Sequence, residues 1–435
     1  MRLIHCADLH LDSGMRSNLS KEKARERKKE LLLTFQRMVD YAAEQEVSAI
    51  LMAGDLFDTR QISATARHAV WDAVCSHDDI TFFYLKGNHD TEHFLAEREA
   101  LPENFKIFGS EWTYYPLGER IVISGLELSD ENAGRAYRSL VLRQEKFNIV
   151  MLHGQETKTG ARDKAQVIRL RELKNKGIDY LALGHVHSYR EGKLDARGAW
   201  CYSGCLEGRG FDECGDHGFV LLDVDEKQGT ATRQFVPFAG RRLWEVPVDV
   251  SGCEQATQML ERVRAALGRQ VNDRQESGEQ GMDRQIFCGG TYIRTDLEKQ
   301  QSVPEMLSSG QAGDIPGKSE GMLSAEDNDE DMSGQYTISD RDLIKIILIG
   351  ELDVETAQID LEYLRKALEP YYYFVKISNE AKLRVDANRF LLDESLKGEF
   401  VRTVMAAKEL SEEERATVIR CGLRAIAGEE VLGCD

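Results

Sequence analysis

Short apolar runs alternate with longer segments that carry polar residues on one face throughout the first 250 residues. This alternation predicts strands interleaved with helices around a buried sheet, which is an α/β architecture. The runs expected as strands are 2–6, 47–52, 80–85, 121–124, 148–152 and 180–183, with a closing hairpin at 218–224 and 231–237. Gly, Asp, Asn or His follows most of these runs at once, so polar side chains are expected to gather where strands end.

A second, smaller α+β domain is expected over 241–390. It has strand-like runs at 244–250, 343–349 and 371–377, and helical patterns at 254–267 and 354–368. A stretch rich in Gln, Gly, Ser, Asp and Glu interrupts it at about 269–340. Such a composition buries too little apolar area to offset the entropy of chain ordering. We therefore predict a first domain over 1–240, a split second domain and a flexible acidic insertion within it.

Two amphipathic helices are predicted over 395–430. The second begins with Ser411 and Glu414 in capping-box spacing, and an apolar row at Ile419, Leu423 and Ile426 follows. This row could cover the smaller domain or form an interface with another protein.

The composition bears on location and partners. No stretch reaches the ~18 uninterrupted apolar residues that a membrane helix needs, and a polar break precedes any signal-like region, so we expect a cytoplasmic protein without a membrane partner. Nine scattered cysteines predict reduced thiols. The net charge of -19 argues against a nucleic-acid partner, yet 1–250 holds 34 Lys and Arg against 39 Asp and Glu, so most of the acidity lies later in the chain.

Five short motifs occur in order, each at the end of an expected strand. They are Asp8-Leu9-His10, Gly54-Asp55-Leu56-Phe57-Asp58, Gly87-Asn88-His89-Asp90, His153-Gly154 and Gly184-His185-Val186-His187. Imidazole and carboxylate suit Mn, Fe and Zn alike, and loops at strand ends can converge on one cleft. Residues i and i+2 at an extended strand end point to the same side, so both can reach one metal. A carboxylate can bridge two ions, and Asp55 is central in the set. A single motif could be an ordinary turn, but five in order indicate a metal site.

The motif order resembles the calcineurin-type metallophosphoesterase superfamily. Within it, the segment from Ala7 to Asp12, the Gly54 to Asp58 box and the stretch from Gly204 to Gly215 are similar to the SbcD family of DNA-repair nucleases. The similarity is strong over 1–250 and loose over the smaller domain. It implies a β-sandwich flanked by helices, a smaller α+β cap domain and C-terminal helices.

This resemblance also implies roles for individual residues. One metal would be held by Asp8, His10, Asp55 and His187, and the other by Asp55, Asn88, His153 and His185. His89 would face the scissile phosphate and stabilise or protonate the leaving oxygen. The expected cofactors are two divalent ions, with manganese as the expected metal, and no other cofactor. Because the ligand set holds only two carboxylates, the ions would leave positive charge in the cleft and attract a phosphodiester.

The expected function is therefore a two-metal-dependent DNA nuclease, with exonuclease and endonuclease activity, in repair or end processing. The resemblance implies an SbcC-type coiled-coil ABC ATPase as partner, docked on the C-terminal helices, and a homodimer through helices near 64–74 and 91–101. No Walker motif occurs in the sequence, so ATP use would belong to the partner. Two alternatives stay open: a metallophosphatase acting on a phosphomonoester or cyclic nucleotide, and a non-catalytic scaffold, which the intact His89 disfavours.

Three further features have an ordinary explanation that we favour. A zinc site could use Cys201, Cys205, Cys214 and His217, but their spacing is not that of a common zinc knuckle, so plain thiols are expected. The segment 21–30 holds six cations with three Glu between them, which is typical of a solvated helix face rather than a DNA-tracking surface. The aromatic run 371–374 is expected to pack rather than to stack on bases.

Overall fold

The computed structural model describes residues 1–15, 19–58, 62–90, 93–96, 100–157, 167–268, 338–354, 358–385, 390 and 392–427. Most of the insertion expected at about 269–340 lies outside the described residues, as does much of the helix expected near 91–101. Within the described part of the chain, no helix is long and apolar enough to cross a membrane.

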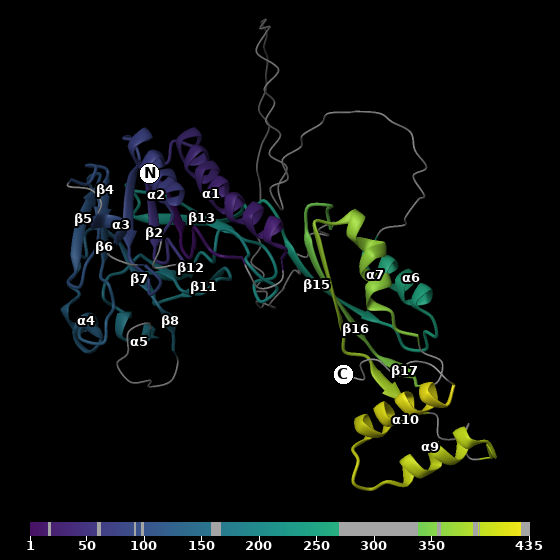
Figure 1. Cartoon of the computed structure of the whole chain (residues 1–435). Coiled ribbons are helices and arrows are strands. Elements are labelled where there is room, and N and C mark those ends of the chain that lie inside the picture. Colours follow the sequence, from purple (N-terminus) through teal and green to yellow (C-terminus); the bar gives the residue numbers. More distant parts are fainter. Residues whose placement is uncertain are drawn as a thin grey trace, which may run out of the picture.

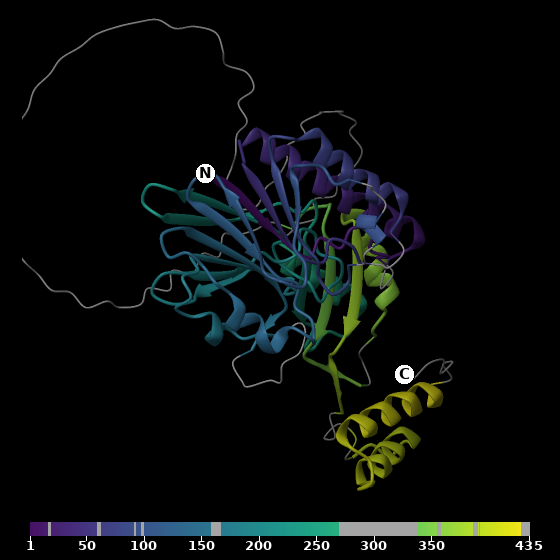
Figure 2. The same cartoon turned by 90° about the vertical axis from the view of Figure 1, so that its left-hand side faces the viewer.

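Two six-stranded sheets form the sandwich unit, which comprises β1 to β14 and the helices around them (Figures 1 and 2). The first sheet has the order β14-β13-β1-β2-β3-β4. Its strands are β1 (Arg2–Cys6), β2 (Ala49–Ala53), β3 (Thr81–Leu85), β4 (Phe105–Ile107), β13 (Gly218–Asp225) and β14 (Thr230–Pro237). Strands β1 to β4 are parallel, and the β13–β14 hairpin joins β1 in antiparallel orientation, as the sequence predicted.

The second sheet has the order β11-β12-β10-β7-β6-β5. Its strands are β5 (Thr113–Leu117), β6 (Ile121–Gly125), β7 (Phe147–His153), β10 (Tyr180–Gly184), β11 (Arg190–Lys193) and β12 (Ala199–Tyr202). The four inner strands are parallel, and both edge strands are antiparallel to their neighbours. A small pair, β8 (Gln155–Glu156) and β9 (Val167–Ile168), extends beyond β7.

The two sheets pack face to face through an apolar core. Leu3, Leu51 and Phe83 of the first sheet meet Ile123 and Ile149 of the second. Helices α1 (Lys21–Glu44) and α2 (Ala64–Ser76), with the short α3 (His93–Ala96), cover the outer face of the first sheet, and α4 (Ala133–Ser139) and α5 (Leu170–Leu173) cover the second (Figure 2). The expected mixed α/β sandwich flanked by helices is confirmed.

A smaller parallel sheet follows the sandwich. Strands β15 (Leu243–Asp249), β16 (Leu343–Ile349) and β18 (Phe374–Asn379) form it in the order β15-β16-β18. Helices α6 (Ala256–Ala266) and α7 (Leu361–Leu368) share its apolar core, and β17 (Glu351–Asp353) pairs with β19 (Lys382–Arg384). We call these elements the cap unit.

Two boundaries in the cap unit differ from the expectation. The helix expected over 354–368 begins at Leu361, because the Asp360 side chain caps it by accepting the backbone N–H of Tyr363. The strand expected from 371 begins at Phe374, because the 3-10 helix η1 (Glu369–Tyr371) with Pro370 precedes it.

The cap unit contacts the sandwich through α1 and the aromatic run. The Nζ of Lys23 donates to the carbonyl oxygen of Tyr373 at 2.5 Å, and Arg241 lies 3.5 Å from the centre of the Tyr373 ring. Phe374 stacks on Phe211, with ring centres 6.2 Å apart. Tyr372, Tyr373 and Phe374 therefore pack, as expected, whereas Tyr371 is 36% exposed. Of the cations in 21–30, Lys23, Arg27 and Lys28 are engaged within the chain, so the segment is not a uniformly solvated face.

The C-terminal helices α9 (Leu396–Ala406) and α10 (Glu412–Ile426) form a hairpin beyond the cap unit (Figure 1). The predicted capping box is present at the start of α10. Ile419 and Leu423 are buried with Val401 and Val404 of α9 and with Val354 and Phe390 outside the hairpin, so these two residues of the row close the hairpin and join it to the cap unit.

The expectation of reduced thiols holds for six described cysteines and fails at one. Cys6, Cys75, Cys201, Cys205, Cys214 and Cys253 are free. Cys421 in α10 is disulfide-bonded.

Candidate metal centre

All five motifs lie where parallel strands end, after β1, β2, β3, β7 and β10. Backbone hydrogen bonds hold the loops together: the N–H of Asp8 donates to Gly54 O at 3.0 Å, and the N–H of His10 donates to Asp55 O at 3.0 Å. These bonds join two loops of the first sheet. The backbone N–H of His185 and the Nδ1 of His153, both from the second sheet, donate to Asp8 Oδ1 and to the carbonyl oxygen of Ala53, so the strand ends of the two sheets meet at one place.

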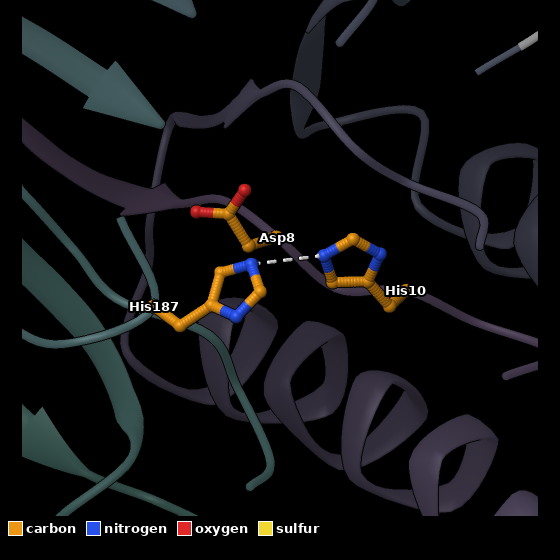
Figure 3. Close-up of side chains that lie close together, drawn as sticks. All are labelled: Asp8, His10 and His187. Atoms are coloured by element: carbon orange, nitrogen blue, oxygen red, sulfur yellow. Dashed lines mark hydrogen bonds between the residues drawn. The ribbon is translucent and has the colours of Figure 1, made fainter. Parts of the chain in front are cut away.

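One group consists of Asp8, His10 and His187, each with a possible ligand atom within 4.8 Å of the others (Figure 3). The Nε2 atoms of His10 and His187 lie 3.2 Å apart. Both carboxylate oxygens of Asp8 accept the backbone N–H of His185 at 2.9 Å. We call this group the first position.

A second group consists of Asp55, His153 and His185, also within 4.8 Å of one another. Asn88 belongs with it, because its Oδ1 lies 3.1 Å from His153 Nε2 and 3.2 Å from His185 Nδ1. We call this group the second position. Asp55 Oδ2 lies 3.3 Å from His153 Nε2 and 3.9 Å from His10 Nε2, which places this carboxylate between the two positions. The structure thus brings all seven residues predicted as ligands together.

Three imidazole rings are oriented in the same way. His153 Nδ1 donates to the carbonyl oxygen of Ala53 at 2.9 Å, and His187 Nδ1 donates to Glu213 Oε1 at 2.6 Å. His10 Nδ1 faces Asp58 Oδ1 at 3.3 Å without hydrogen-bond geometry. The hydrogen bonds of His153 and His187 keep the proton on Nδ1 and direct the Nε2 lone pair inward, and the Asp58 carboxylate favours the same arrangement in His10 through its charge. Inward lone pairs with no proton between them are a donor set that fits a divalent cation.

The buried carboxylates make the site favourable for positive charge. Burial lowers the pKa of His153, but its hydrogen bond with Asp55 and the charges of Asp8 and Asp55 outweigh this and raise the pKa to about 9. Burial raises the pKa of Asp55, and the hydrogen bond and charge of His153 overcome it and hold the pKa at about 2. The same negative potential that attracts a proton here would attract a metal ion.

His185 and His187 respond to their own neighbours. Burial, together with the charge of His153, lowers the pKa of His185. Burial also opposes charge on His187, but its hydrogen bond with Glu213 leaves its pKa raised. The surroundings therefore disfavour charge on His185, whereas the Glu213 carboxylate favours it on His187.

His89 occupies the open side of the site. Its backbone N–H donates to Asp55 Oδ1 at 2.9 Å, while its side chain is 45% exposed. The ring centre lies 5.2 Å from that of His10, and Nδ1 lies 3.6 Å from Asp58 Oδ1. His89 is therefore anchored beside the metal-ligand candidates with a ring that a substrate can reach.

The backbone is strained where these side chains converge. Positive φ angles occur at Asp8 (51°), His10 (44°), Asp55 (52°) and His185 (100°), in a region that L-residues with a side chain rarely adopt. Such strain persists only where the surroundings impose it, and it clusters at functional sites.

Three residues near the site were not predicted to act there. Asp90 accepts the backbone N–H groups of Leu56, Phe57 and Gly87, which ties two motif loops together. Arg209 and Glu213 form an ion pair of 2.8 Å behind His187. The only indication in the sequence was their position: Asp90 belongs to the Gly87 to Asp90 motif, and Arg209 and Glu213 belong to the Gly204 to Gly215 stretch.

The alternative zinc site does not form. Cys205 Sγ lies 3.2 Å from His217 Nδ1, and His217 Nε2 donates to the carbonyl oxygen of Glu213 at 2.7 Å. Cys214 is exposed and contacts the carbonyl oxygen of Phe211. Among the described residues, no group of three possible metal ligands includes a cysteine, in agreement with plain thiols.

A pocket of about 310 Å³ opens beside the second position. Asn88 and His153 line it on the metal-centre side. Lys86 and the segment 127–131, with Glu127, Asp130 and Glu131, line the rest. A small phosphate ester could therefore approach the site here, past several carboxylates.

Comparison with known proteins identifies related sequences. Residues 1–189 match the family model described as calcineurin-like phosphoesterase. The uncharacterized metallophosphoesterase YhaO of Bacillus subtilis is 31% identical over 286 residues, which cover 62% of this chain and 68% of YhaO. The DNA double-strand break repair protein Mre11 of Methanopyrus kandleri is 27% identical over 296 residues, 61% of this chain and 62% of its own. Among solved structures, a dimetal phosphatase from Danio rerio aligns with 51% of this chain and 91% of its own, with a TM-score of 0.34 and 12% identity.

Proposed function

The chain belongs to the calcineurin-like metallophosphoesterase superfamily, and on that premise we propose that it is a two-metal-dependent DNA nuclease of the SbcD type. The observation that carries the proposal is the common orientation of His10, His153 and His187. Each has an oxygen partner at Nδ1 and directs Nε2 toward the centre, where Asp55 lies between two groups of ligands.

In this proposal Asp8, His10, Asp55 and His187 would hold one ion, and Asp55, Asn88, His153 and His185 would hold the other. Manganese is the metal we propose for both. Bound divalent ions would supply an activated water and a Lewis acid for the phosphate. The chain's own part is to fix two ions close together through Asp55 and to leave a net positive site, because the set holds only two carboxylates.

His89 is the residue we assign to proton transfer. Its exposed ring can reach a phosphate held at the two positions, and an imidazole can donate a proton to the leaving oxygen near neutral pH. Asp58 Oδ1, 3.6 Å from Nδ1, orients the ring.

Sequence similarity and architecture both support DNA as the proposed substrate. The relative from Methanopyrus kandleri is named as a DNA double-strand break repair protein. We propose that 1–240 is the nuclease domain and that 241–390 is a cap that offers a long polymer a second surface. The contacts of Phe374 with Phe211 and of Tyr373 with Lys23 support this arrangement, since they hold the cap unit beside the loop that carries Glu213.

We also propose that the segment 395–430 docks an SbcC-type coiled-coil ATPase. The apolar row of α10 is buried in the hairpin, so the docking surface would have to use other residues. Leu392 (94% exposed), which precedes α9, and Leu396 (71% exposed), its first residue, are apolar side chains available for it. A homodimer through α2 and the segment near 91–101 remains part of the same proposal.

A phosphatase acting on a monoester or cyclic nucleotide is the second candidate. The pocket beside Asn88 and His153 favours it, because its volume of about 310 Å³ suits a small ligand. Its carboxylates at Glu127, Asp130 and Glu131 oppose it, because they would repel the two negative charges of a monoester.

The experiment offers the purified full chain, with Mn²⁺, end-labelled duplex DNA and p-nitrophenyl phosphate in parallel. The nuclease proposal expects DNA cleavage that EDTA abolishes, and a His89→Ala variant that retains metal but loses cleavage. Turnover of the monoester alone would support the phosphatase. A non-catalytic scaffold would show no turnover of either substrate, and any activity of an assembled complex would survive His89→Ala.

A further inference from the structure

We propose that Arg209 is a positioning residue that sets two ligands of the first position at once, through Asp58 and Glu213. This inference rests on the proposed function for the identity of the ligands. We call Asp58, Arg209 and Glu213 the guanidinium clamp.

The first link is between the guanidinium and the two carboxylates. Arg209 Nη1 donates to Asp58 Oδ1 at 3.2 Å, and Nη2 donates to Glu213 Oε1 at 2.8 Å. The backbone N–H of Arg209 also donates to Glu213 Oε2 at 2.7 Å. Two carboxylates from distant parts of the chain are thus held by one planar group, which a lysine side chain cannot imitate because it has no fork of donors.

The second link is between each carboxylate and one imidazole. Glu213 Oε1 accepts from His187 Nδ1 at 2.6 Å, and Asp58 Oδ1 lies 3.3 Å from His10 Nδ1. The Nη2 atom of Arg209 also lies 3.2 Å from His187 Nδ1. Because Glu213 Oε1 is closer to this ring nitrogen, His187 Nδ1 carries the proton and donates it to Glu213. The clamp therefore holds the His187 ring by a hydrogen bond and places a carboxylate beside Nδ1 of the His10 ring, and the Nε2 atoms of the two rings lie 3.2 Å apart.

The clamp is itself immobilised. The Glu213 side chain is 7% exposed, and those of Arg209 and Asp58 are 19% and 22% exposed. Ser13 Oγ donates to the other oxygen of Asp58 at 2.9 Å, and the other oxygen of Glu213, Oε2, accepts the backbone N–H of Arg209 at 2.7 Å. Neither carboxylate can therefore turn without breaking a second hydrogen bond.

The second position is held differently. His153 Nδ1 donates to the backbone carbonyl oxygen of Ala53, at the end of β2. The hydrogen bond that orients this ring therefore comes from the main chain and not from another side chain. The loss of Arg209 should therefore weaken the first position and spare the second. A purely structural role for Arg209 would weaken both alike.

The test loads metal-free full chain with Mn²⁺ and measures bound metal per chain, together with the electron paramagnetic resonance spectrum. The wild type should bind two ions, with a spin-coupled signal. Arg209→Met should bind one ion under the same conditions, with an uncoupled signal, because a lost outer partner costs about 10- to 100-fold in affinity. His187→Ala, which removes a ligand, provides the reference for a lost first position.

Arg197→Met is the matched control. Arg197 also pairs with a carboxylate, Asp179, at 2.8 Å, but it lies before β12, at the end of the sheet opposite the metal centre. It should bind two ions as the wild type does. Arg209→Lys should fall between the wild type and Arg209→Met, because one ammonium can serve one carboxylate.

Equal weakening of both positions, or two coupled ions in Arg209→Met, would overturn the inference. If Arg209→Met does not fold, Glu213→Gln carries the same test, because it keeps the side-chain size but weakens the bond to His187. A wild type that binds no pair of ions would instead defeat the proposed function, so the two failures are distinguishable.

Discussion

The sandwich unit and the cap unit both contain parallel strands, but only the sandwich collects strained polar residues where the strands end. Non-glycine residues with positive φ stand at Asp8, His10, Asp55 and His185 in the sandwich. In the cap unit, the described positive-φ residues near strand ends are Gly252 and Gly350, which adopt this conformation without strain. A parallel strand end is therefore not enough for a site; the edges of two packed sheets have to meet.

The largest expected effect, on cleavage and bound metal, comes from replacing an aspartate at a strand end of the sandwich. The comparison is the same replacement at a strand end of the cap unit. Asp55→Ala removes the carboxylate that lies between both positions, so cleavage should fall by roughly 10,000-fold, the scale for losing an essential group. Bound Mn²⁺ per chain should fall with it. Asp249→Ala, at the end of β15, removes only hydrogen bonds to Ser251 and should leave both quantities at wild-type values. Full activity of Asp55→Ala would contradict the assignment of a shared ligand.

This contrast also explains what could be predicted from sequence. The strands of the sandwich follow from apolar periodicity, and the motifs placed seven residues at one edge because parallel strands end together. The ion pair of Arg209 and Glu213 with His187 could not be predicted, because contacts between distant loops leave no periodic signal. The start of α7 was missed because a side-chain cap at Asp360, and not hydrophobic periodicity, decides where the helix begins.

The second comparison sets a buried ion pair in the sandwich against an exposed one in the cap. Arg27 and Glu207 are 1% and 0% exposed and lie 3.1 Å apart. Arg27→Met leaves Glu207 buried without its charged partner, so the free energy of unfolding should fall by about 3–5 kcal/mol in urea titrations. Arg365→Met, which removes the exposed pair with Glu362, should cause no measurable change.

A double variant sharpens this second comparison. Replacing both Arg27 and Glu207 with Met removes the uncompensated charge and should recover much of the lost stability. A loss as large as that of Arg27→Met alone would mean that packing around α1, rather than the buried charge, causes the effect.

The third comparison concerns glycines. A Cβ atom on Gly87 would lie 2.2 Å from Asp55 Oδ1 and 2.4 Å from the Asp55 backbone nitrogen, so Gly87→Ala must displace the shared carboxylate. Activity should fall by about 100-fold, the effect of a misplacement near 1 Å. Gly252→Ala in the cap unit meets no atom within 4 Å and should leave activity intact, with only a small loss of stability from its φ of 73°. Similar activity of the two variants would show that Asp55 tolerates displacement.

The smallest effect is a pH dependence at the junction of the two units. Burial raises the pKa of Glu30, but its hydrogen bonds and charge pairs with Arg241 and Arg27 leave that pKa lowered. A lowered carboxyl pKa contributes stability above the unfolded value of about 4.3, and this stability is lost as the pH falls through the folded value. Glu30→Gln should therefore destabilise the chain at pH 7 on the order of 1 kcal/mol, and the difference from wild type should shrink as the pH falls below 4.

Glu362 in the cap unit is the control for this pH effect. Its hydrogen bond with Arg365 lowers its pKa to about 2, yet the pair is exposed, with side chains 56% and 38% accessible. Water and salt screen such a pair, so Glu362→Gln should match the wild type in urea titrations at both pH values. If Glu362→Gln lowers the free energy of unfolding as much as Glu30→Gln does, burial does not decide how much these ion pairs stabilise the chain. The contrast between the two units would then rest on the strained metal centre alone.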